Sequence, residues 1–139
     1  MTEETDVVLK DLSILVEKEW EKRLREFVRL ERCRSLREMI IYFLEVMLAV
    51  ARQKPNLQLT LEDSVELFKG HLRSVISGEL YQSLVEKAGE YGIKVSDLIR
   101  IFLAMALNFH TTLVPKKVVL RKEDFIELIL SQFETSART

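Results

Sequence analysis

The segment His71–Phe109, HLRSVISGELYQSLVEKAGEYGIKVSDLIRIFLAMALNF, decides the predicted fold of this chain. The segment opens with a short run that includes Arg73–Ser77, in which polar and apolar residues can be assigned to alternate faces of a β-strand. Apolar residues then recur every three or four positions as far as Tyr91, which predicts a helix. Gly92 marks the end of that helix, because glycine takes a left-handed conformation without a Cβ clash.

A second helix is predicted after the glycine. Ser96 and Asp97 are residues that cap helix N-termini, because a side-chain oxygen accepts hydrogen bonds from the first-turn amides. The residues that follow, 98–109, are apolar on nearly every side of a helix apart from Arg100 and Asn108. Such a helix must be covered by several other elements or by a second chain.

This order of a strand, a helix, a glycine turn and a serine-capped apolar helix resembles the ribbon–helix–helix family of DNA-binding regulators. The residues that carry the resemblance are Ile76–Leu80, Ala88 before Gly92, and Ser96–Arg100. The resemblance implies that two such strands pair into a two-stranded antiparallel ribbon, which enters the major groove of double-stranded DNA.

The preceding half of the chain repeats this order. A β-type run at 12–16 precedes a helical pattern at 18–32, and Ser35 can cap a helix at 36–52. Each half then has a proline, an extended piece and an acidic-capped helix, at 61–69 and at 122–133.

A constant shift along the sequence superposes the two halves. It places Ser13 on Ser74 and Leu59 on Leu120, with the register around Ser35 open by one residue. The matching order of elements is stronger evidence for an internal duplication than the few identities are.

The predicted fold is therefore mostly α, made of tandem ribbon–helix–helix-like repeats, each followed by an extra helix. The first repeat covers residues 7–70 and the second covers 71–134. Two unrelated helical halves are the alternative. The two strands could pair within one chain or between two chains, and the sequence leaves both open; we expect a homodimer or another homo-oligomer.

Charge and composition limit the function. The chain has 139 residues with 21 basic and 22 acidic side chains, and this balance counts against a dedicated nucleic-acid binder, although a local basic patch is enough to neutralise phosphates. With the lone Cys33 and no signal peptide, we expect a cytoplasmic protein. No phosphate-binding glycine loop, HExxH motif or metal-ligand spacing is present, so we expect no enzyme activity, cofactor or metal.

The resemblance assigns the base contacts to the ribbon. If Ile76 faces inward, Arg73 and Val75 face outward, with His71 at the entry of the strand. Arginine recognises guanine by a bidentate bond to O6 and N7. In the first repeat the corresponding outward positions would be Leu12, Ile14 and Val16, which are all apolar. They could offer DNA only contacts with a thymine methyl. Alternatively, this face of the first strand is buried against the rest of the protein.

Phosphate contacts are predicted at two places. Ser96 begins a helix whose exposed amides and dipole favour an anion, although ordinary capping would use the same residue. A basic stripe on the first helix could follow the phosphate backbone: Lys18, Lys22, Arg25, Arg29 and Arg32, extended by Arg34 and Arg37. A solvated helix face with Glu–Arg pairs is the alternative.

Together these features predict a non-enzymatic, DNA-binding transcriptional regulator. The alternative is a protein-interaction or scaffold module, which keeps the helical core and does not bind DNA. The near-neutral charge and the apolar outer positions of the first strand favour this alternative.

Overall fold

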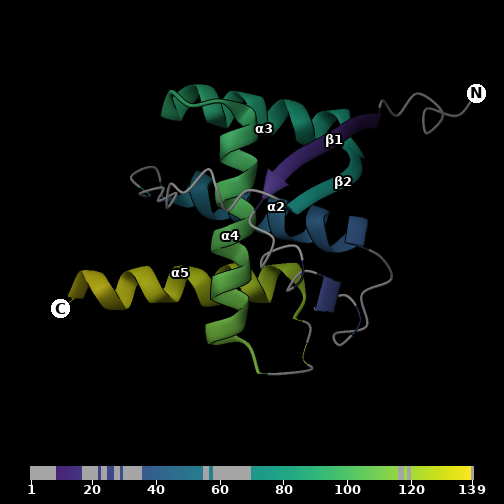
Figure 1. Cartoon of the computed structure of the whole chain (residues 1–139). Helices are drawn as coiled ribbons and strands as arrows, with labels where there is room; N and C mark the ends of the chain where they lie inside the picture. The colour runs from purple at the N-terminus through teal and green to yellow at the C-terminus, as the bar shows by residue number, and fades with distance from the viewer. Residues whose placement is uncertain are drawn as a thin grey trace, which may run out of the picture.

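Two strands and four helices form most of the described part of the computed structural model: β1 (Leu9–Val16), α2 (Leu36–Gln53), β2 (Gly70–Ser77), α3 (Gly78–Tyr91), α4 (Val95–Leu113) and α5 (Lys122–Arg138) (Figure 1). The structure describes residues 9–16, 22, 25, 26, 29, 36–54, 57, 70–115, 118 and 120–138. The side chains of 9–16, 36, 70–74 and 134–138 lie outside this description. The described chain is mostly helical, as the sequence predicts. The predicted helix at 61–69 lies outside the described residues.

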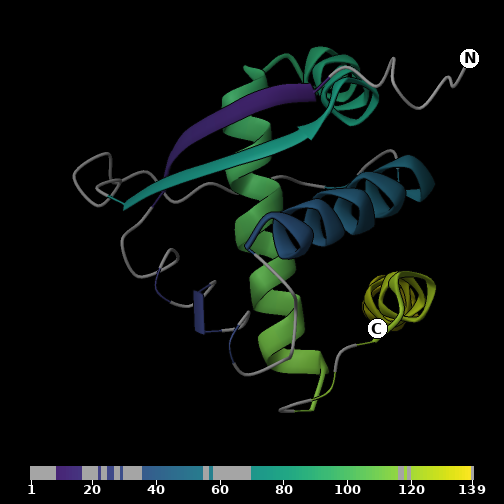
Figure 2. The same ribbon diagram turned by 90° about the vertical axis from the view of Figure 1, so that its right-hand side faces the viewer.

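The two strands pair with each other in one chain. β1 is antiparallel to β2, with Leu9 opposite Ser77 and Val16 opposite Gly70. Of the two pairings that the sequence leaves open, the structure therefore has the one within the chain. Figure 2 shows the ribbon crossing in front of α4 and above α2, and none of the described elements passes in front of its near face.

The strand register corrects the predicted outer face of β1. Ile76 is fully buried, so its face of the ribbon is the inner one. Directly opposed residues of an antiparallel pair share a face, and faces alternate along a strand. The inner series of positions therefore includes three residues of β1 that were predicted to be outward, namely Leu12, Ile14 and Val16, which lie opposite Ser74, Leu72 and Gly70. That prediction is wrong.

Both ends of α3 are closed by residues suited to their positions. Ser77 is the N-cap, and its hydroxyl oxygen accepts a hydrogen bond from the amide of Leu80 at 3.1 Å. Gly92 is the C-cap in the left-handed conformation (φ 71°), as predicted, and the amide of Ile93 donates to the carbonyl of Ala88 at 3.0 Å. The chain therefore turns directly from α3 into α4.

The start of α4 differs from the prediction. The N-cap is Lys94, which makes no side-chain capping bond, and Ser96 lies inside the helix. The prediction of Ser96 as the cap is therefore wrong. The apolar pattern allows the helix to begin about a turn earlier, with Leu98 already buried. The helix ends at Leu113, before Pro115, because the residue before a proline disfavours the helical conformation.

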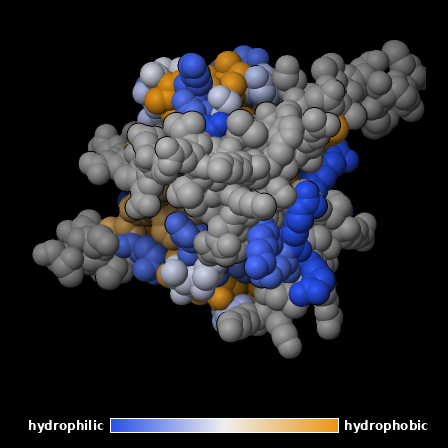
Figure 3. All heavy atoms as spheres, in the orientation of Figure 1, coloured by the Kyte–Doolittle hydropathy of each residue, from blue (hydrophilic) through white to orange (hydrophobic). Residues whose placement is uncertain are grey.

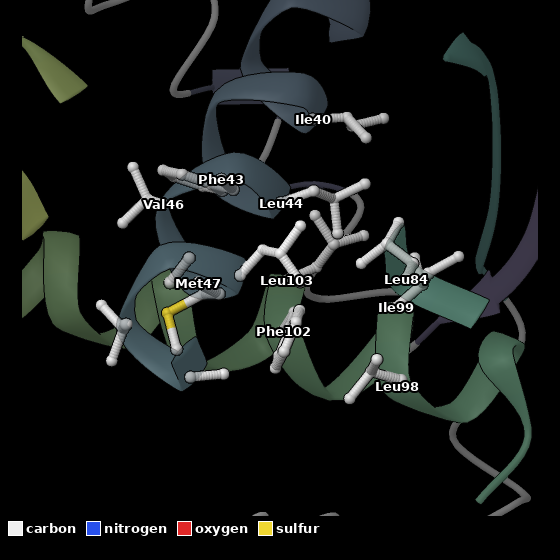
Figure 4. Close-up of a cluster of buried hydrophobic side chains, with 14 of the residues drawn as sticks. Ile40, Phe43, Leu44, Val46, Met47, Leu84, Leu98, Ile99, Phe102 and Leu103 are labelled. Atoms are coloured by element: carbon white, nitrogen blue, oxygen red, sulfur yellow. The ribbon is translucent and has the colours of Figure 1, made fainter. Parts of the chain in front are cut away.

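The core is centred on the crossing of α2 and α4. Figure 4 shows the apolar side chains of α2 meeting those of α4, with Leu84 of α3 beside them. Phe43, Leu44 and Phe102 are fully buried in this cluster. Both of these helices are apolar around most of their circumference, and the ribbon, α3 and α5 cover their remaining faces.

A cluster of rings joins α5 to this core. Phe125 of α5 is fully buried and lies 5.8 Å from the ring of Tyr42 and 5.4 Å from that of His110, measured between ring centres. The hydroxyl of Tyr42 donates to the carbonyl of Leu120 at 2.7 Å, which fixes the segment that leads into α5. The last helix is therefore part of the same core as α2 and α4.

The buried positions of α2 and α4 correspond when the first residues of the two helices, Leu36 and Val95, are aligned. Both members of each of seven pairs are then buried: Met39 and Leu98, Ile40 and Ile99, Phe43 and Phe102, Leu44 and Leu103, Met47 and Ala106, Leu48 and Leu107, and Ala51 and His110. The predicted superposition places Ile40 on Ile101 instead, which does not match these buried positions; the internal duplication stays a prediction.

The predicted superposition also does not fit the ribbon. It makes Leu12 equivalent to Arg73. Leu12 lies opposite Ser74, so the two residues Leu12 and Arg73 are on different faces of the ribbon. A shift shorter by one residue keeps equivalent residues on one face. It relates Leu12 to Leu72, and Ser13 to Arg73, the residue that lies directly opposite it.

Candidate nucleic-acid interface

The outer face of the ribbon holds the predicted base-contacting positions. Its series consists of the residues that alternate with the buried Ile76 and their partners: His71, Arg73, Val75 and Ser77 on β2, and Leu9, Asp11, Ser13 and Leu15 on β1. Val75 and Ser77 are half-buried, and the side chains of the others are outside the described part of the structure. The register thus brings three predicted site residues, His71, Arg73 and Val75, to one face, together with positions that the sequence did not indicate.

Arg37 connects the start of α2 to this ribbon. Its Nε donates to the carbonyl oxygen of Val75 at 2.8 Å. The Arg37 side chain is exposed, so the bond lies at the surface. The sequence predicts Arg37 only as an extension of the basic stripe, because a partner so distant along the chain leaves no local signal.

Ser96 lies in the first turn of α4, on a different element from the predicted base contacts. Ser96 is half-buried, and the carboxylate of the neighbouring Asp97 forms a salt bridge with the guanidinium of Arg100 at 2.7 Å. Since Lys94 gives no side-chain cap, the amides of the first turn receive no bond from that residue. A helix start of this kind favours a nearby anion through its dipole.

Part of the predicted basic stripe is described. Lys22, Arg25 and Arg29 are helical and exposed, and so is the acidic Glu26. Arg32 and Lys18 lie outside the described residues. In Figure 3, hydrophilic side chains gather along the right-hand edge of the molecule, the side that Figure 2 faces. The exposed part of the stripe therefore carries basic side chains together with the acidic Glu26.

Among the described residues, two titratable groups have shifted pKa values, and burial is the main cause of both shifts. Burial lowers the pKa of His110 to about 4, so the imidazole is neutral at pH 7. Burial, with a smaller contribution from Glu90, raises the pKa of Tyr91. His110 packs between Phe43 and Phe125, which makes it a core residue.

Within the described ranges, no three His, Cys, Asp or Glu side chains gather in an arrangement that could hold a metal ion. None of the described helices combines the length and the apolar character needed to cross a membrane. Comparison of the chain with protein-family models, with curated proteins and with solved structures gives no match.

Proposed function

We propose that this chain is a non-enzymatic DNA-binding regulator, built from two ribbon–helix–helix-like halves, whose β1–β2 ribbon enters the major groove. The observation that carries the proposal is the antiparallel pairing of β1 with β2 over α2 and α4, with Arg73 in the outer series. A major groove about 12 Å wide admits a two-stranded ribbon.

The correspondence between the halves supports this architecture. Burial matches between α2 and α4 when Ile40 is paired with Ile99, and the inner strand positions match when Leu12 is paired with Leu72. One half alone would leave its second helix uncovered, whereas two halves bury α2 and α4 against each other. The ribbon is complete in one chain, so it needs no second chain; a homodimer stays a prediction and would supply two ribbons.

Phosphate contacts have separate support. The first turn of α4, with Ser96, offers amides at the positive end of a helix dipole. Arg25 and Arg29 are exposed cations on a helical segment. These groups would hold the DNA backbone without selecting sequence, while Arg73 and its neighbours contact bases.

The register weakens the alternative, a protein-interaction module. One of its two arguments was an apolar outer face on the first strand. The positions that share the face of Arg73 on β1 are Leu9, Asp11, Ser13 and Leu15, of which two are polar. The near-neutral net charge of −1 remains in its favour.

Salt dependence of binding tests the proposal. Affinity for random-sequence duplex DNA should fall steeply between about 50 and 200 mM salt, because phosphate neutralisation releases counterions. Replacing Arg29 with alanine should lower the slope of log K against log salt by about one phosphate contact. Glu26→Ala, on the same segment, is the matched control and should not lower this slope. Absence of binding at about 50 mM salt would transfer the assignment to the interaction module.

A further inference from the structure

The ribbon has an approximate two-fold axis through its centre. Ser13 and Arg73 lie directly opposite each other, and the shift that relates Leu12 to Leu72 makes them equivalent. A two-fold axis perpendicular to the ribbon there exchanges β1 and β2 and keeps each face. It relates three pairs of outer positions: Ser13 to Arg73, Asp11 to His71, and Leu15 to Val75.

The residue types at these positions do not obey the two-fold symmetry. The guanidinium of arginine at position 73 can donate two hydrogen bonds to one base and accepts none, whereas the hydroxyl of serine at position 13 donates one and can also accept. Asp11 is an acceptor that suits the N4 amino group of cytosine, and its equivalent is the imidazole of His71. Only Leu15 and Val75 are alike, since both are apolar.

A ribbon formed by two identical chains must present the same residues twice. This chain forms its ribbon alone, so the two strands are free to differ. The outer positions of one strand, from Asp11 to Leu15, extend over about 14 Å, or roughly four base-pair steps. The DNA on one side of the centre of the ribbon would therefore face different side chains from the DNA on the other side.

From this geometry we infer that one chain recognises a short, non-palindromic DNA sequence. Arg73 specifies a guanine near the centre of the site, and Asp11 specifies a base pair on one side only. The inference rests on the proposed DNA-binding function and adds the symmetry of the DNA site to it.

Selection of duplexes from a random library by the full chain tests this inference, with native mass spectrometry to count the chains on each selected duplex. The expected result is a motif without inverted-repeat symmetry for each bound chain; a homodimer would place two copies of that motif on one duplex. Arg73→Ala should reduce the preference at one base pair by about 5- to 150-fold, and Asp11→Ala should change the preference at a different one.

A symmetrised variant sharpens the test. Asp11→His, Ser13→Arg and Leu15→Val together give both strands the outer residues of β2, and the selected motif should then become an inverted repeat. Two arginines directly opposite each other repel, so thermal unfolding should first show that the variant folds. Should it not fold, Arg73→Ala alone still tests whether one base pair is affected.

The outcomes separate the two claims. An inverted repeat within the site that one unmodified chain covers, or equal binding to every sequence, would overturn the inference and leave DNA binding intact. Failure to retain any duplex at about 50 mM salt would overturn the proposed function itself.

Discussion

Arg37 and Val75 connect the helical core to the ribbon, because Nε of Arg37 donates to the carbonyl oxygen of Val75 at 2.8 Å. The next residue of β2, Ile76, is fully buried, so the bond lies next to a residue that packs the strand against the core. Arg37 is in the first turn of α2, and the bond therefore fixes where this helix begins relative to the outer face of the ribbon.

Replacing Arg37 with alanine should lower the free energy of unfolding by about 1 kcal/mol, the usual net value of one hydrogen bond at the surface. Urea unfolding measures this loss. Gln53→Ala, at the opposite end of the same helix and also exposed, is the control, and its effect should stay within about 0.5 kcal/mol. Equal losses from both changes would show that the bond to Val75 does not contribute to stability.

The two glycines near the end of α3 should respond in opposite directions to alanine. An added Cβ meets no atom within 4 Å at either Gly89 or Gly92, so packing does not distinguish them. Gly92 has a φ of 71°, and Gly92→Ala should destabilise the protein by about 1–2 kcal/mol. Gly89 is within the helix, where alanine should stabilise by about 0.5–1 kcal/mol. The same sign for both variants in urea unfolding would contradict the assigned turn.

Phe125 tests whether α5 belongs to the core. Its ring is fully buried against Tyr42 and His110, and Phe125→Ala should cost about 3–5 kcal/mol, because a cavity remains. Glu123→Ala, at an exposed position of the same helix, should cost less than about 0.5 kcal/mol. A loss below about 1 kcal/mol for Phe125→Ala would mean that α5 does not pack as described.

His110 makes the stability of the fold depend on pH. Its pKa is about 4 in the folded protein and near 6.5 in the unfolded chain, so the unfolded chain binds more protons in between. Stability should be full above the unfolded value and should fall as the pH decreases from about 6.5 to 4, with a slope of at most about 1.4 kcal/mol per pH unit. Urea unfolding of the protein and of His110→Leu across this range measures the difference. Parallel pH profiles would contradict a buried, neutral imidazole.

Local patterns were enough to predict several elements. The alternation before Ser77, the glycine at 92 and the apolar periodicity of α2 and α4 each depend on neighbouring residues, and the strands and helices form there. The antiparallel pairing of the two strands was also among the predicted arrangements.

Three-dimensional features were less accessible from the sequence. The face of each β1 residue depends on its partner in β2, and a shift of one residue reverses every face. Local capping rules favoured Ser96, but the apolar contacts of Leu98 and its neighbours extend α4 back to Val95. The bond from Arg37 to Val75 joins residues far apart in the chain and has no sequence signal.

Methylation interference on the selected duplex tests most directly whether the ribbon enters the major groove. Guanine N7 lies in the major groove and adenine N3 in the minor groove. The account predicts that a methyl group at N7 of one central guanine excludes DNA from the bound fraction, and that Arg73→Ala removes this exclusion. Interference only at adenine N3, or interference at guanine N7 that Arg73→Ala leaves unchanged, would contradict it.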